Sequence, residues 1–98
     1  MIVAELDEVQ YDLEIDGEQV REQLARRVWE KAGWATIAIL FRERDRHGEW
    51  KHPKLALLRF RKVHDVWKKQ AALTLSGDDA VAMIDQLVDW RDRLRPEA

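Results

Sequence analysis

The chain has 98 residues, no cysteine and a formal net charge of −2. A chain of this length forms one domain with a modest core, and the lack of cysteine excludes disulfides and thiolate metal sites. The start of the chain lacks the basic and apolar regions of a signal peptide, and the longest apolar run, near Ile37–Phe41, is far shorter than the roughly 20 residues of a membrane span. We therefore expect a single domain over residues 1–98, in a cytoplasmic protein.

Charge is sorted along the chain into three blocks. Residues 1–19 hold seven acidic residues and no Lys or Arg, whereas residues 20–76 hold fourteen basic residues against six acidic ones. Residues 77–98 are acidic again, with six acids against three arginines. The basic block also contains four of the five tryptophans. Basic residues interleaved with aromatic ones are what a surface needs to hold phosphates and stack bases.

The first third of the chain carries a strand pattern with one ambiguous segment. Residues 1–15 alternate apolar and polar side chains in patches, which predicts one or two short strands with the acids facing water. In residues 18–31, Val20, Leu24 and Val28 lie four apart, a spacing that fits a helix and also one face of a strand. Strand is favoured for residues 25–30, because the next four residues, 30–33, resemble a hairpin loop containing glycine.

Three strands and a helix are expected next. Residues 34–44, 54–63 and 66–75 are rich in β-branched, aromatic and alternating side chains, and a polar loop over 45–54 and a tight turn at His64-Asp65 separate them. Ser76 followed by Asp79 resembles a capping box, the arginines fall near the end, and Pro96 stops the element. An apolar stripe that includes Ala80, Ile84 and Leu87 predicts an amphipathic helix over 77–95.

These elements predict an α+β fold: an antiparallel β-sheet meander of four or more strands backed by one C-terminal α-helix. The helix can cover only one face of the sheet. We expect that face to carry Ile37, Ile39, Phe41, Leu58, Phe60, Leu73 and Leu75. Within the single domain, residues 1–19 are then an acidic strand segment, residues 20–76 a basic sheet and residues 77–95 the helix.

The opposite, open face of the sheet is the best candidate site. It is basic and aromatic at its ends and apolar at its centre, and we expect it to bind single-stranded DNA or RNA with little sequence preference. The residues that we expect to bind nucleic acid are Trp29, Trp34, Arg42, Arg44, Trp50, Lys51, Lys54, Arg59, Arg61 and Lys68. The alternative is that this face docks a protein, because the apolar centre around Leu40, Leu55 and Leu57 needs covering. A homodimer, which we expect this protein to form, or the N-terminal strand could cover it.

The loop over residues 44–54 is a second candidate. Trp50, flanked by Lys51 and Lys54, could close over a strand of nucleic acid from the loop tip. The alternative is that Trp50 packs back on the sheet.

Several short motifs resemble the positive cofactor four family of transcriptional coactivators, and the Whirly proteins are similar in outline. They are the Arg- and Lys-rich strands, the loop Gly48-Glu49-Trp50-Lys51-His52-Pro53, and Leu73-Thr74-Leu75-Ser76 before a terminal helix. The resemblance implies a dimer of four-stranded sheets with one helix each, which binds single-stranded DNA across the sheet in transcription or DNA maintenance. It would place Trp50, Lys51 and Lys54 in the binding loop. The chain departs from the family pattern by the strand pair 54–75 between loop and helix, by His52 between Lys51 and Pro53, and by its acidic start.

Other chemistry finds little support in the sequence. The spacing of His47, His52 and His64 fits no standard metal site, and no nucleophile motif or phosphate-binding glycine loop is present. We therefore expect no enzyme, no metal and no cofactor. The acidic N-terminus could compete with phosphates for the basic sheet or pair with a second subunit. It could also be an edge strand whose charge discourages aggregation.

Overall fold

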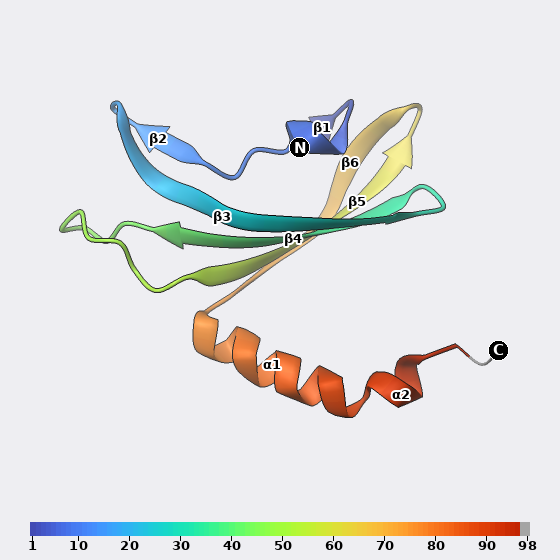
Figure 1. Ribbon diagram of the computed structural model, residues 1–98. Coiled ribbons are helices and arrows are strands. Elements are labelled where there is room, and N and C mark those ends of the chain that lie inside the picture. The colour runs from blue at the N-terminus through green and yellow to red at the C-terminus, as the bar shows by residue number, and fades with distance from the viewer. Residues whose placement is uncertain (97–98) are drawn as a thin grey trace.

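The fold is a curled, six-stranded antiparallel sheet with two C-terminal helices, in a computed structural model that describes residues 1–96 (Figure 1). The strands lie in the order β1-β6-β5-β4-β3-β2. Their bounds are β1 Ile2–Val3, β2 Leu13–Ile15, β3 Glu18–Lys31, β4 Trp34–Glu43, β5 Lys54–Val63 and β6 Val66–Leu75. The 3-10 helix η1 spans Leu6–Glu8, and the helices are α1 Gly77–Asp89 and α2 Arg91–Leu94. The predicted α+β class is confirmed, although residues 97 and 98 of the predicted domain lie outside the described residues.

The ambiguous segment 18–31 is one long strand, β3, paired along its length with β4. The hairpin that joins them is tighter than predicted. Lys31 pairs directly with Trp34, so the turn contains only Ala32 and Gly33, with φ values of 53° and 80°. Two positive φ values in a two-residue turn are typical of the type I′ hairpin, whose twist matches that of the strands. The predicted four-residue loop over 30–33 therefore begins two residues too early, although its end at Gly33 is correct.

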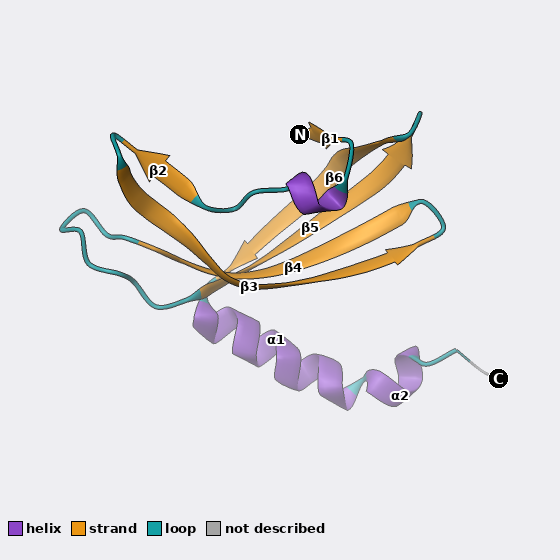
Figure 2. Ribbon diagram, turned by 45° about the horizontal axis from the view of Figure 1, so that its top comes forward, coloured by secondary structure: helices purple, strands orange, loops and turns teal. Residues whose placement is uncertain are grey.

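The hydrophobic core lies on one face of the sheet, called the inner face here. It is built from alternate residues of the central strands, and its largest fully buried members include Ile37, Ile39, Phe41 and Phe60. Leu6 and Val9 of the N-terminal segment complete this core, and Tyr11 packs against it. Figure 2 shows η1 on one side of the sheet and α1 on the other. The N-terminal segment thus covers the face that the sequence assigned to the C-terminal helix.

The N-terminal segment reaches this position by pairing at both edges of the sheet. Strand β1 pairs with β6 at one edge, and β2 pairs with β3 at the other, so the chain between them crosses the inner face. Its first strand, β1, lies at one edge of the sheet and pairs with Trp67 and Lys68 of β6. The strand prediction for residues 1–15 holds only for these two short ends.

Leu73 and Leu75 lie on the opposite, outer face, and not with the core as predicted. They pair directly with Leu57 and Leu55, which alternate with the buried residues of β5. A register shift causes this, because Arg59 pairs with Ala71 while the neighbouring Phe60 pairs with Lys69. The extra residue, Gln70, inverts the alternation of β6, as a β-bulge does. Trp67, before the bulge, remains in the core.

Helix α1 begins directly after β6 and contacts β5 and β6. The Ser76 hydroxyl accepts a hydrogen bond from the backbone N–H of Asp79, the predicted N-cap. Ala80 is the single buried residue of α1. The helix ends at Trp90, and the short α2 follows, so the predicted helix 77–95 is divided in two. No helix within residues 1–96 is long and apolar enough to cross a membrane.

Candidate nucleic-acid interface

The outer face of the sheet consists of an apolar band between two groups of arginine and tryptophan. Residues that pair across antiparallel strands share a face, which fixes the membership of each group. The apolar band contains Ala25, Ala38, Leu40, Leu55, Leu57, Leu73 and Leu75. Arg27 interrupts it on β3, opposite Ala38, and its guanidinium carbon lies 5.7 Å from the centre of the Trp29 ring. At one end of the strands lies the Trp34 cluster, defined as Trp29, Lys31, Trp34, Thr36, Arg59, Arg61 and Lys68. At the other end lies the Trp50 cluster of Arg42, Arg44 and Trp50.

Register brings the Trp34 cluster together from four neighbouring strands. Trp34 lies opposite Lys31 on β3 and Arg61 on β5, and Arg61 lies opposite Lys68 on β6. One row further along, Thr36 lies between Trp29 and Arg59. The guanidinium carbons of Arg59 and Arg61 lie 4.8 Å and 5.3 Å from the centre of the Trp34 ring. Both distances are within the range of a cation–π contact.

A hollow lies between the two tryptophans of this cluster. Its volume is about 640 Å³, and its lining includes Trp29, Glu30, Lys31, Trp34, Thr36 and Arg59. Trp29 is 53% exposed, so one side of its indole is open to solvent. Arg59 Nη1 donates a hydrogen bond of 2.7 Å to the Thr36 hydroxyl, which orients the guanidinium beside the hollow. Two indoles and an oriented arginine suit a planar, anionic ligand.

The Trp50 cluster is packed more tightly and its charges are already partnered. The guanidinium carbons of Arg42 and Arg44 lie 4.2 Å and 4.0 Å from the centre of the Trp50 ring. Arg42 also forms an ion pair of 3.0 Å with Glu22. Arg44 donates hydrogen bonds of 2.8 Å to the carbonyl oxygens of Gln19 and Gly48. Trp50 is therefore held against the sheet, as the alternative for the loop supposed, and is not at a loop tip.

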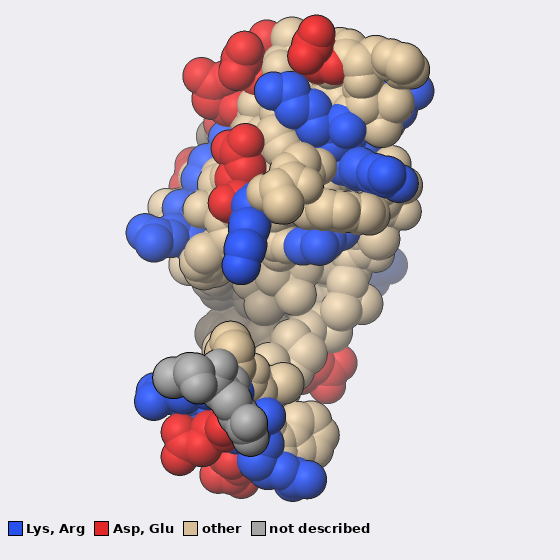
Figure 3. Space-filling model, turned by 90° about the vertical axis from the view of Figure 1, so that its right-hand side faces the viewer, with Lys and Arg blue, Asp and Glu red and all other residues tan. Residues whose placement is uncertain are grey.

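The two clusters differ in the charge that they offer to a ligand. Among residues 1–96, Arg59, Arg61 and Lys68 form no ion pair with a carboxylate, whereas Arg42 and Arg44 pair with Glu22 and Glu18. Figure 3 shows several Lys and Arg side chains, with Asp and Glu among them, over the hairpin end of the sheet. The positive charges of Arg59, Arg61 and Lys68 are therefore less neutralised by ion pairs than those of Arg42 and Arg44.

Two predicted residues lie apart from both clusters. Lys54 is on the inner face, because it pairs with Phe41, and its ammonium lies 3.3 Å from the Glu43 carboxylate. Lys51 lies with His52 beside the start of α1, where they line a separate hollow. The outer-face site thus gathers eight of the ten predicted residues and leaves out Lys51 and Lys54.

The geometry adds Lys31 and Thr36, which the sequence prediction did not include. Lys31 was placed inside a hairpin loop, so its position opposite Trp34 was hidden until the turn was known. Thr36 was assigned to the correct face, but its role depends on the cross-strand pairing with Arg59. If the sequence Ala32-Gly33 had been interpreted as a two-residue type I′ turn, Lys31 would have been predicted to lie in the strand opposite Trp34.

Glu43 is the one titratable group whose pKa is clearly displaced among residues 1–96. Burial alone would raise the pKa of its carboxyl group. Hydrogen bonds from Lys54 and Arg21, together with their positive charges, outweigh that effect, so the pKa lies below its usual 4.5. Glu43 is on the inner face and joins β3 to β5 across β4. This is a structural ion-pair network and not a sign of catalysis.

Comparison with protein-family models, with curated proteins and with solved structures finds no match to this chain. The resemblance to the positive cofactor four family therefore remains a prediction from short motifs. Within residues 1–96, no group of His, Asp and Glu side chains is placed to hold a metal ion.

Proposed function

We propose that the chain binds single-stranded nucleic acid, with little sequence preference, through the Trp34 cluster on the outer face. The observation that carries this proposal is the hollow between Trp29 and Trp34, which is lined by Arg59 and Lys31 as well as Glu30. Arg61 lies beside it over the Trp34 ring, and neither arginine forms an ion pair among residues 1–96. A base would stack on the exposed indole of Trp29, and the neighbouring phosphates would contact Arg59, Arg61 and Lys68.

The energetics of such a site favour single strands over sequence-specific duplex recognition. Stacking of a base on an aromatic side chain contributes about 1–3 kcal/mol and tolerates any base, because each base has a π-face. The arginines add a salt-dependent term by displacing counterions from the phosphates. The proposal also includes a role in transcription or DNA maintenance in the cytoplasm, which we infer from the sequence alone.

A titration of tryptophan fluorescence with an oligo(dT) and with an oligo(rU), at low and at physiological salt, tests the proposal. We expect quenching that weakens several-fold as salt rises. Trp29→Ala should lower the affinity by about tenfold or more, in line with the loss of one stacked base. Trp90→Ala, on the C-terminal helical segment, is the matched control and should leave the affinity unchanged.

Two results would contradict the proposal. One is the absence of quenching at low salt in a folded sample, which would instead favour docking of a protein on the outer face. The other is an equal loss of affinity in Trp29→Ala and Trp90→Ala, which would place binding outside the Trp34 cluster. DNA and RNA are distinguished by the ratio of the two affinities.

A further inference from the structure

The apolar stripe of α1 becomes basic toward its C-terminal end. Ala80, the one buried residue of α1, marks the side of the helix that touches the sheet. Ile84 and Leu87 follow on that side by helical spacing, and Arg91 and Arg95 continue the same spacing of four residues after Leu87. The residue that joins α1 to α2 keeps a right-handed helical backbone, so the spacing extends across the junction. Two arginines therefore lie on the side of the helices that begins at the sheet.

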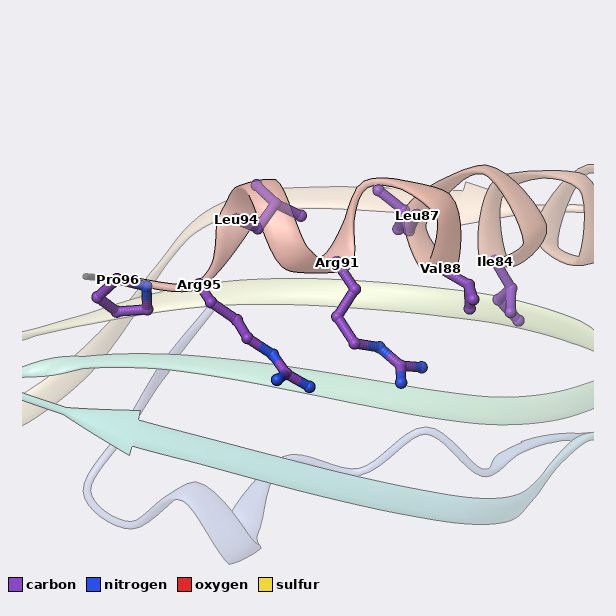
Figure 4. Close-up of a pocket in the computed structure, with 7 residues that line it drawn as sticks. All are labelled: Ile84, Leu87, Val88, Arg91, Leu94, Arg95 and Pro96. Carbon is purple, nitrogen blue, oxygen red and sulfur yellow. The ribbon is translucent and has the colours of Figure 1, made fainter. Parts of the chain in front are cut away.

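A hollow along this side of the helices contains both arginines. It has a volume of about 480 Å³ and is lined by Ile84, Leu87, Val88, Arg91, Leu94, Arg95 and Pro96. Figure 4 shows Arg91 and Arg95 pointing to the same side of the helix as Ile84 and Val88. Arg93 is not among the lining residues and borders a different hollow with Trp90. The three arginines of this region are thus divided, two on the hollow and one away from it.

Both helices lie on the outer-face side of the sheet. Figure 2 shows η1 and α1 on opposite sides of the sheet, and Leu6 of η1 belongs to the core of the inner face. In Figure 1, α2 is at the end of the sheet where the β3–β4 turn lies. This is the end that carries the Trp34 cluster.

The length of the helices agrees with this placement. From Ser76 to Arg91 a helix advances by about 22 Å, at 1.5 Å per residue. Going back along β6 from Leu75 to Lys68 covers a similar about 23 Å, at 3.3 Å per residue. A helix that returns from the end of β6 is therefore long enough to bring Arg91 to the level of the Trp34 cluster.

The direction of α1 is fixed at its first residue. A Cβ atom at Gly77 would come within 2.8 Å of the His52 ring and 3.0 Å of the Pro53 carbonyl oxygen. Gly77 is therefore packed against the loop before β5, and Ser76 directly precedes it as the N-cap, so α1 follows β6 without a linker. The two arginines are thus held on the outer-face side before any ligand arrives.

The charges of these arginines are almost unopposed within residues 1–96. Arg91 forms no ion pair there, and Arg95 contacts only Asp92, at 3.8 Å, with side chains that are 68% and 90% exposed. An ion pair so open to water contributes little. Asp85 and Asp89 lie on the opposite side of α1 by helical spacing. The side that faces the sheet therefore ends in net positive charge.

Two sets of positive charge border the same open space. The first is Arg91 and Arg95 on the helices, and the second is Arg59, Arg61 and Lys68 of the Trp34 cluster. The space between them is open, because Trp29 on the sheet is 53% exposed and no residue of the sheet lines the hollow of the helices. Like charges on two sides of a space repel each other, and an anion between them reverses the sign of the interaction. The charge on both sides therefore matches a polyanion.

We infer that Arg91 and Arg95 form a second wall of the nucleic-acid site, so that a single strand is held between the helices and the Trp34 cluster. This inference rests on the proposed function. It adds that the strand, whose bases stack on the sheet, has phosphates in contact with the helices as well. The ligand is then enclosed from two sides, and the helices take part in binding.

Binding of oligo(dT) to the full-length chain, measured at four or five salt concentrations, tests the inference. Arg91→Ala and Arg95→Ala should each weaken binding at low salt several-fold, and each should lower the slope of log K against log salt by about 0.7, as expected for one lost phosphate contact. Arg93→Ala is the matched control, because it removes the same charge from the other side of α2. Arg91→Lys keeps the charge and should retain the slope. Alanine and lysine are good helix formers, and circular dichroism confirms that each variant is folded.

Arg59→Ala, on the sheet, separates the two levels of the proposal. If Arg59→Ala weakens binding whereas Arg91→Ala and Arg95→Ala bind as the wild type does, the second wall is overturned and the proposed function stands. A folded wild-type protein that does not bind oligo(dT) at low salt overturns both. An equal effect of Arg93→Ala overturns the second wall, because charge alone and not its position would then matter. So does poly-glutamate that displaces oligo(dT) at equal charge concentration, which would assign the arginines to an acidic protein.

Discussion

Arg26 Nη1 donates a hydrogen bond of 3.1 Å to the backbone carbonyl oxygen of Val9. The other terminal nitrogen, Nη2, donates to the carbonyl oxygen of Leu6 at 3.4 Å. One arginine of β3 therefore holds both core residues of the N-terminal segment over the inner face. It links the acidic block to the basic block by main-chain hydrogen bonds, and it explains why the N-terminal segment covers the core.

Arg26→Ala should destabilise the protein strongly. The substitution leaves two carbonyl oxygens without their donor beside the core, and the loss of hydrogen bonds to a charged group costs about 1.5–3 kcal/mol. Urea unfolding, followed by circular dichroism, measures the change. Arg27→Ala is the control, because the next side chain along β3 faces away from the core, and it should stay within about 0.5 kcal/mol of the wild-type protein. Equal effects of the two variants would contradict the role of Arg26.

The strands were predictable because their signal is local. In β4 and β5, β-branched and aromatic side chains alternate without interruption, so Ile37, Ile39, Leu58 and Phe60 were assigned to one face correctly. The bulge at Gln70 was not predictable, because it depends on how β6 pairs with β5 and leaves no mark in the alternation itself. That single residue moved Leu73 and Leu75 from the expected core to the outer face.

The element that covers the core could not be chosen from the sequence. Both the helix α1, with its apolar stripe, and the N-terminal segment, with Leu6 and Val9, could pack apolar side chains on a sheet. The choice depends on long-range contacts, namely the hydrogen bonds of Arg26 and the pairing of β1 and β2 at opposite edges. The basic-aromatic face followed from alternation, whereas the pairing of each arginine with its tryptophan required the register between strands.

Ala32→Asn should stabilise the protein. Ala32 has a φ of 53°, in the left-handed region, and an L-residue other than asparagine, aspartate or glycine costs roughly 1 kcal/mol there. Asparagine followed by Gly33 is the preferred pair of a type I′ turn. We expect a gain of about 0.5–1 kcal/mol in the free energy of unfolding, measured by urea titration. Ala82→Asn, on the exposed surface of α1, is the control and should lower stability. A loss of stability in Ala32→Asn would show that the turn is under no such strain.

Glu43→Gln should lower stability at neutral pH and change its dependence on acid. The pKa of Glu43 lies below its usual 4.5, so the unfolded chain binds a proton at higher pH than the folded protein does. The carboxylate therefore contributes stability above about pH 4.5, and the contribution is lost as pH falls through the lowered pKa. The difference between wild type and Glu43→Gln should shrink on acidification from pH 7 to pH 3. Glu49→Gln is the control and should behave like the wild-type protein. If the stability difference between wild type and Glu43→Gln stays constant from pH 7 to pH 3, the ion-pair network is not its source.

Arg61→Ala should reduce the salt dependence of nucleic-acid binding more than Arg42→Ala does. Both residues lie on the outer face and both stack on a tryptophan, at 5.3 Å and 4.2 Å from the ring centres. Only Arg42 has an acidic partner, Glu22, at 3.0 Å. An unpaired arginine that contacts a phosphate displaces counterions, and its removal lowers the slope of log K against log salt by about 0.7 for a single strand. A paired arginine must first give up its carboxylate, so its removal changes the slope less.

Binding measured at four or five salt concentrations gives the slope for each variant. Arg46→Ala is the control, because it removes the same charge from the exposed loop before Trp50, outside the Trp34 cluster. If Arg42→Ala and Arg61→Ala lower the slope equally, the ligand contacts the Trp50 cluster as strongly as the Trp34 cluster and spans the whole length of the strands.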